Sequence, residues 1–171
     1  ILSRERHALC RQNGWSYPAR AIRTHDFLYI RNYAPDRWPA GDPPLFGDVD
    51  AHMLHYPCPT KMHMLANRDD PAVRPLFELG FGKRPAEELY DLREDPEQMN
   101  NVAANDAYAT DRERLSAQMN GYLQATGDPR VTGGKILWNS TMYYMTDDFT
   151  PEPSAEAIER LGLEEEYDYF G

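Results

Sequence analysis

One short segment near the N-terminus gathers residues that could bind an anion. His7 follows Arg6 directly and lies three residues after Arg4. A histidine flanked by arginine can donate hydrogen bonds to a sulfate, a carboxylate or a sugar hydroxyl, and arginine binds oxyanions through two parallel hydrogen bonds. We therefore predict His7 as a ligand-binding residue, followed by Arg6 and Arg4. The competing explanation is that the two arginines pair with acidic residues of a neighbouring domain.

A second group of candidates lies in the region of residues 47–64. Lys61 could reach an anionic sugar, and His55 lies close to it in the sequence. A solvated lysine on a surface loop is the competing and commoner explanation. His52 and His63 join His55 in a loose histidine cluster. The region lacks helical periodicity and regularly spaced cysteine or acidic ligands, so we expect no metal site in this chain.

The charge of the chain is negative overall and unevenly distributed. The net charge of −10 disfavours nucleic acid as a partner, because neutralising phosphates needs a basic surface. Residues 1–37 nonetheless contain seven arginines and three acidic residues, whereas residues 147–171 contain nine acidic residues and one basic residue. The basic N-terminal part suits a small anionic ligand, and arginines that merely solvate a sheet surface are the alternative. No apolar run is long enough to span a membrane.

The clearest structural unit is a β-hairpin. Residues 20–24 and 27–33 are rich in β-branched and aromatic side chains, and a polar dipeptide separates them. The expected register places apolar side chains opposite each other across the two strands. The expected pairs are Ile22 with Tyr29 and Ala21 with Ile30.

Shorter elements and a long loop follow the hairpin. Residues 34–59 are dense in proline, glycine and aspartate, which predicts a long, ordered surface loop that packs through residues such as Trp38 and Phe46. We also predict a short helix over 70–80 and a strand over 87–92.

A strong helix signal spans residues 107–125. Its apolar positions recur at helical spacing and predict a buried stripe. These positions are Leu115, Met119, Tyr122 and Leu123. A short acidic helix is expected near 154–161. The sequence thus predicts an α+β fold, with a small antiparallel β-sheet, one main packed helix and long loops.

A motif in residues 88–102 has a distinctive order. Glu-Leu-Tyr-Asp-Leu is followed after two residues by Asp-Pro and then by Asn-Val, and the residues concerned are Leu89, Tyr90, Asp91, Leu92, Asp95, Pro96, Asn101 and Val102. Together with the hairpin before it and the amphipathic helix after it, this motif resembles the C-terminal subdomain of sulfatases. The segments around His7 and the hairpin are most similar to the bacterial branch that resembles heparan N-sulfatase (N-sulfoglucosamine sulfohydrolase). The resemblance covers residues 1–130, with 34–85 as a long loop or insertion, and leaves 131–171 as an acidic C-terminal extension.

Ser16 begins a second pattern that sulfatases also use. Ser16, Pro18 and Arg20 match Ser/Cys-x-Pro-x-Arg, the motif around the residue that becomes the formylglycine nucleophile. In sulfatases that residue opens a helix, where backbone N–H groups help to hold the sulfate. Here a hairpin follows Arg20 instead. We therefore predict that Ser16 is not a nucleophile and that this chain contains no catalytic residue.

The resemblance implies that catalysis and closure of the substrate pocket belong to different parts of a larger enzyme. In the family, whose whole fold is alkaline-phosphatase-like, a large N-terminal α/β domain carries the formylglycine and the calcium site, and the C-terminal subdomain closes the rim of the substrate pocket. It implies that this chain is the C-terminal portion of a sulfohydrolase acting on a sulfated glycan of the N-sulfoglucosamine type, and that the chain is inactive alone. Its expected partners are that N-terminal domain and the sulfated sugar, and the segment containing His7 is expected to enter the pocket. A periplasmic or secreted bacterial location is expected, with the signal peptide in the missing part.

Two other functions stay open on the sequence alone. The chain could be a free-standing, non-catalytic module that binds anionic glycans, or the C-terminal part of a related phosphodiesterase or phosphonate hydrolase. Cys10 and Cys58 are compatible with one disulfide or with two thiols.

Overall fold

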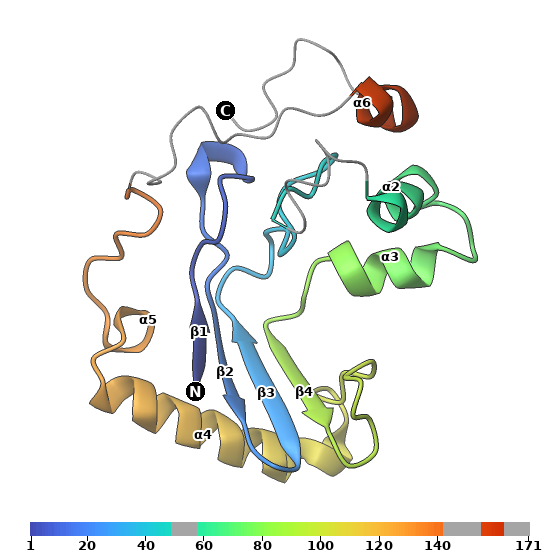
Figure 1. Cartoon of the computed structure of the whole chain (residues 1–171). Coiled ribbons are helices and arrows are strands. Elements are labelled where there is room, and N and C mark those ends of the chain that lie inside the picture. The colour runs from blue at the N-terminus through green and yellow to red at the C-terminus, as the bar shows by residue number, and fades with distance from the viewer. Residues whose placement is uncertain (49–57, 142–154, 163–171) are drawn as a thin grey trace. The chain divides into compact units, whose positions relative to one another are not determined.

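The computed structural model describes residues 1–48, 58–141 and 155–162, which form two compact units (Figure 1). We call them the sheet unit and the helical unit. The sheet unit comprises residues 1–5, 17–35 and 84–138, and the helical unit comprises residues 6–16, 36–83 and the described residues from 139 onward. Neither unit is continuous in sequence, because the chain passes between them several times. The expected division of the chain at residue 130 stays a prediction.

Four antiparallel strands form the sheet, in the order β1-β2-β3-β4. They are β1 (Leu2–Arg4), β2 (Ala19–Arg23), β3 (Phe27–Asn32) and β4 (Glu87–Asp91). The predicted hairpin is confirmed together with its register, since Ile22 lies opposite Tyr29 and Ala21 opposite Ile30. Strand β1 was not predicted, because three exposed residues at a sheet edge are too few to show an alternating pattern.

The hairpin turn contains no glycine, and Thr24 closes it instead. The backbone N–H of Thr24 donates to the Phe27 carbonyl at 2.9 Å. In return, the backbone N–H of Phe27 donates to the Thr24 hydroxyl at 3.0 Å. A threonine side chain can take over a turn hydrogen bond in this way, so the two residues between need no left-handed backbone conformation.

The sheet unit also contains the main helix. Residues of η2 (Asp106–Tyr108) form a 3₁₀ turn that leads into α4 (Ala109–Ala125), and α5 (Pro129–Thr132) follows after Gly127. The predicted helix over 107–125 is therefore confirmed, with its first turn tightened. An α+β fold with a small antiparallel sheet and one main packed helix is likewise confirmed, whereas its assignment as a sulfatase subdomain rests on the sequence relationship reported below.

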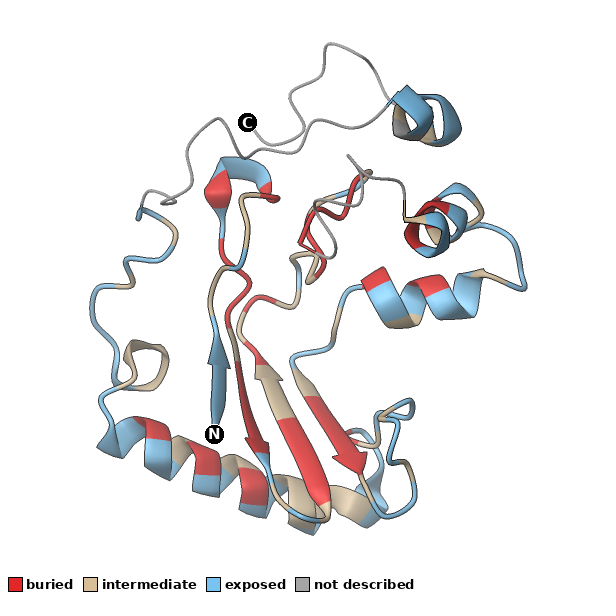
Figure 2. Cartoon of the chain, viewed as in Figure 1, coloured by how far each residue is buried: buried red, intermediate tan, exposed pale blue. Residues whose placement is uncertain are grey.

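The core of the sheet unit lies between the sheet and one side of α4 (Figure 2). Leu115, Met119 and Leu123 are buried against Tyr29 and Leu89 and their neighbours. Tyr122 was expected on the same stripe, and this prediction is wrong, since 52% of Tyr122 is exposed. At 100° per residue Tyr122 lies about 60° from the centre of the buried stripe, on its edge.

The helical unit has three short α-helices and a 3₁₀ turn among its described residues. They are η1 (Gln12–Gly14), α2 (Pro59–Ala66), α3 (Arg74–Phe81) and α6 (Ala155–Leu161). Helix α6 matches the predicted acidic helix, and α3 begins four residues later than expected because Asp70 and the residues after it form a turn. Helix α2 was missed, since the region was expected to lack helical structure. Residues 34–48 form the ordered loop that was expected, and the rest of the predicted loop up to residue 57 lies outside the described residues.

An ion-pair network ties the N-terminus of the sheet unit to the end of α4. The Arg20 guanidinium donates to Asp128 at 2.7 Å and to Glu5 at 2.7 Å, and Arg130 donates to Glu5 at 2.6 Å. Asp128 also caps α5 by accepting the backbone N–H of Arg130 at 2.9 Å. Arg20, the last residue of the Ser-x-Pro-x-Arg pattern, is therefore a structural residue of the sheet unit.

Acid should weaken this network through Asp128. Burial alone would raise the pKa of the Asp128 carboxyl, but hydrogen bonds from Arg20 and from the Arg130 backbone, with their charges, hold that pKa below the usual 3.8. A carboxyl with a depressed pKa in the folded state stabilises the fold fully above its unfolded pKa and loses this contribution as the pH falls through its folded pKa. We expect the free energy of unfolding to decrease below about pH 4 and to decrease less steeply in an Asp128→Asn variant. Urea unfolding across this range measures both slopes, and equal slopes would contradict the linkage.

Candidate functional site

Ser16 lies in a setting unlike that of a sulfatase nucleophile. It is buried, and both its backbone N–H and its hydroxyl donate to the Asn139 side-chain oxygen, at 2.9 and 2.7 Å. Its carbonyl accepts a hydrogen bond of 2.7 Å from Arg37. The following residues enter strand β2 instead of a helix. These contacts fit the structural role predicted for Ser16, while its lack of catalytic function stays a prediction.

His7 lies beside a buried carboxylate of the helical unit. Its Nδ1 is 3.1 Å from Oδ1 of Asp48, and 73% of the His7 side chain is exposed, whereas the Asp48 side chain is fully buried. Oδ2 of Asp48 accepts a hydrogen bond from the guanidinium of Arg11, whose side chain is also buried. Arg11 donates as well to the carbonyls of Trp38 and Pro39, at 2.8 and 2.7 Å. An exposed imidazole is therefore anchored to a buried ion pair.

The loop that carries Asp48 is held by a tight turn and by aromatic packing. Gly41 has a φ of +95°, and a Cβ at this position would lie 2.8 Å from the backbone nitrogen of Gly47, so only glycine fits. The Asp48 N–H donates to the Ala40 carbonyl at 2.8 Å. The expected packing of this loop is confirmed, because the ring of Phe46 meets that of Trp38 edge-to-face at 5.4 Å.

Lys61 belongs to the same packing arrangement. It lies in α2 and is buried, and its ammonium group donates to the Phe46 carbonyl at 3.0 Å. The solvated surface lysine considered as an alternative is therefore wrong for this chain. A buried ammonium group needs hydrogen-bond partners, which makes Lys61 a residue that holds the loop in place.

The other predicted residues are not gathered at one point. Arg4 lies in β1 of the sheet unit, and Arg6 belongs to the helical unit, where it donates to the carbonyls of Gly14 and Thr141 at 3.0 and 2.6 Å. His55 lies outside the described residues. The substrate-binding roles of these residues and of His7 stay predictions.

Sequence reasoning missed the two residues that define this arrangement, Arg11 and Asp48. They lie 37 positions apart, and no spacing in the sequence links them. The chemical consequence of their pairing concerns the exposed ring of His7. Nδ1 of His7 lies beside Asp48, and with 73% of its side chain exposed the ring can contact a ligand as a hydrogen-bonding group.

The described residues hold no cluster of three or more His, Cys, Asp or Glu side chains that could bind a metal ion. The expectation that calcium binds another part of the polypeptide stays a prediction. Cys10 and Cys58 are thiols, not a disulfide. Among the described helices, none is both long and apolar enough to cross a membrane.

Comparison with known proteins gives a distant relationship. No family model matches the chain. An ulvan-active sulfatase of Formosa agariphila is 27% identical to it over 116 residues, which is 68% of this chain. The aligned region spans only about a fifth, 19%, of the length of that sulfatase. The chain is thus distantly similar to part of a sulfatase, and this similarity does not favour the heparan N-sulfatase branch that the motifs suggested.

Proposed function

We propose that this chain is the C-terminal part of a sulfatase that acts on a sulfated glycan, and that it contributes His7 to the substrate pocket. The similarity to a sulfatase supports the reaction class. The single structural observation that supports a binding role is the exposed imidazole of His7 fixed on the buried Asp48–Arg11 ion pair.

The geometry suits recognition of a sugar or its anionic group. Holding a histidine through one ring nitrogen fixes its tautomer and its direction before the ligand arrives, which reduces the entropy lost on binding. The exposed part of the His7 side chain then contacts a sulfate oxygen, a carboxylate or a hydroxyl of the substrate. Formylglycine and calcium, which supply the sulfate-cleaving chemistry in the family, are proposed for an N-terminal domain of the same polypeptide, and a glucosamine N-sulfate is the proposed target.

The proposed reaction is tested on the parent polypeptide that contains this chain. The coding sequence before Ile1 should encode Cys/Ser-x-Pro-x-Arg at the start of a helix, and the purified parent should release sulfate from sulfated glycans. N-sulfated and O-sulfated substrates assayed side by side decide the bond type. Hydrolysis of phosphodiesters without any release of sulfate would show that the parent is instead a related phosphodiesterase.

Replacing His7 should weaken substrate use. In the parent enzyme we expect His7→Ala to lower kcat/KM by about one to two powers of ten, the loss expected for one charge-assisted contact. His25→Ala is a matched control, because His25 is also an exposed histidine beside an aspartate, with its Nδ1 2.7 Å from Asp26. Steady-state kinetics with the sulfated substrate compares the two. Equal values for the wild type and His7→Ala would remove His7 from the site.

Neutralising Asp48 should destabilise the helical unit and disturb His7 together. Asp48→Asn leaves the buried Arg11 guanidinium without its counter-charge, and removing one partner of a buried pair costs about 3–5 kcal/mol of unfolding free energy. Asp42→Asn is the control, since the Asp42 carboxylate accepts one hydrogen bond from the described residues, of 2.8 Å, from the Gln12 backbone. It should cost about 1 kcal/mol.

A double variant distinguishes the energetic coupling between Arg11 and Asp48 from a general destabilisation of the loop. Arg11→Met combined with Asp48→Asn removes both charges, so its cost should be smaller than the sum of the two single costs. Chemical denaturation gives the free energy of unfolding of the wild type, of Arg11→Met, of Asp48→Asn and of the double variant. Strict additivity would mean that Arg11 and Asp48 do not depend on each other.

A further inference from the structure

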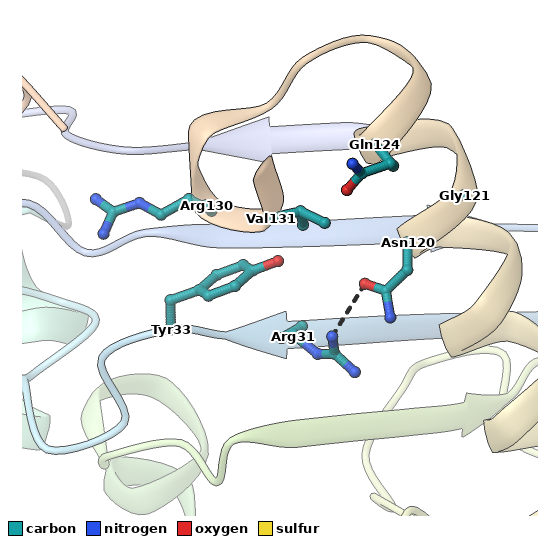
Figure 3. Close-up of a pocket in the computed structure, with 7 residues that line it drawn as sticks. All are labelled: Arg31, Tyr33, Asn120, Gly121, Gln124, Arg130 and Val131. Carbon is teal, nitrogen blue, oxygen red and sulfur yellow. Dashed lines mark hydrogen bonds between the residues drawn. The ribbon is translucent and has the colours of Figure 1, made fainter. Parts of the chain in front are cut away.

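A pocket of about 450 Å³ lies in the sheet unit, and none of the residues that line it is among the predicted substrate-binding residues (Figure 3). It opens between β3 and the C-terminal part of α4, next to α5. This volume falls within the range of small-molecule sites in proteins. The lining residues that matter are Arg31, Tyr33, Asn120, Gly121, Gln124 and Arg130.

Gly121 is an irregularity that packing does not explain. A glycine inside a helix costs about 0.5–1 kcal/mol relative to alanine, and close packing is one common reason for it. A Cβ added at Gly121 would meet no atom within 4 Å. The missing side chain leaves space on the wall of the pocket and serves no contact within the chain.

Tyr33 is a second irregularity in the same pocket. Its hydroxyl oxygen is buried and makes no hydrogen bond to any described residue. Native structures seldom leave a buried polar group unsatisfied, because doing so costs free energy that a partner would recover. Figure 3 shows the hydroxyl end of Tyr33 directed into the space between β3 and α4. A ligand oxygen that reaches this hydroxyl would supply the partner.

Two amide side chains add further hydrogen-bonding groups. The Gln124 side chain is exposed and makes no hydrogen bond to the described residues. Asn120 uses its oxygen to accept from Arg31 at 3.0 Å, which leaves its NH₂ group available on the pocket wall. Amide and hydroxyl groups beside an aromatic ring can bind the hydroxyls and the apolar face of a sugar ring.

The two arginines of the pocket do not favour an anion. Arg31 lies 3.4 Å from Glu87 and also donates to Ser116 at 2.8 Å, and Arg130 makes a two-point pair with Glu5 at 2.6 and 3.2 Å. Their positive charges are therefore already balanced by carboxylates. The pocket offers neutral donors and acceptors without surplus charge.

We infer that this pocket binds an uncharged saccharide unit, through the Tyr33 ring and hydroxyl and the amides of Asn120 and Gln124, in the space that Gly121 leaves open. The inference does not depend on sulfatase activity, because it concerns unsulfated sugar and residues of the sheet unit alone. Its failure and that of the proposed function are therefore observed in separate experiments.

Titration with unsulfated methyl glycosides of glucose, galactose and mannose, followed by NMR of the side-chain amides in the intact polypeptide, tests the inference. At least one glycoside should shift the Asn120 and Gln124 signals saturably, with a Kd on the order of 1 mM, as expected for an open, shallow site. Sodium sulfate should not shift them. No saturable shift with any glycoside, or a response to sulfate alone, would overturn the inference.

Substitutions at the pocket provide the specificity control. Gly121→Leu should fill the pocket and raise the Kd at least about tenfold while the fold is kept, because its Cβ enters open space. Ala125→Leu adds the same bulk at an exposed position of α4 outside the pocket and should leave the Kd unchanged. Tyr33→Phe should weaken binding without lowering the melting temperature, since it removes an unsatisfied group. Equal binding by Gly121→Leu and the wild type would contradict the proposed location.

Discussion

The candidate site depends on one buried carboxylate. Asp48 has a fully buried side chain, and transfer of a carboxylate and a guanidinium out of water is unfavourable by several kcal/mol for each ion. Further hydrogen bonds offset part of this cost: Arg11 donates to the carbonyls of Trp38 and Pro39, and Asp48 faces His7 with its second oxygen. A loop of little regular structure thereby acquires a fixed geometry, and an exposed histidine acquires a fixed direction.

Aromatic packing also stabilises the loop that carries Asp48. Phe46 lies two residues before Asp48 and contacts Trp38, Phe77 and Phe81 at ring distances between 5.4 and 5.5 Å. The Phe46 carbonyl accepts from the buried Lys61 of α2. The loop that carries Asp48 is thus held both by the burial of Phe46 and by the buried cations Arg11 and Lys61. This explains how a segment rich in proline and glycine, which cannot form ladders or helices, holds the carboxylate that contacts His7.

The sequence predicted those parts of the fold that depend on local pattern. The register of β2 with β3 followed from which side chains are apolar, and α4 followed from the 3.6-residue spacing of Leu115, Met119 and Leu123. Helix α2 was missed because Lys61 on its buried side breaks the apolar stripe that would reveal it. The pairing of Arg11 with Asp48 could not be predicted, since it depends on how the loop closes. The three matching residues of the Ser-x-Pro-x-Arg motif likewise do not decide the role of Ser16, whose hydrogen bonds to Asn139 fit a structural role.

An unusual residue such as a conformationally special glycine is explained by the fold when a neighbouring part of the chain requires it, and needs another explanation when none does. Gly41 has a left-handed backbone, and a side chain there would collide with the backbone of Gly47, so the closing of the loop accounts for that glycine completely. Gly121 has no such neighbour, and it lies beside a tyrosine hydroxyl that lacks a partner among the described residues. Sequences that fold well satisfy their local preferences, and violations without internal compensation concentrate at sites that bind something else. Because two such violations meet in one pocket of the sheet unit, a ligand explains both, whereas separate structural causes would have to be found for each.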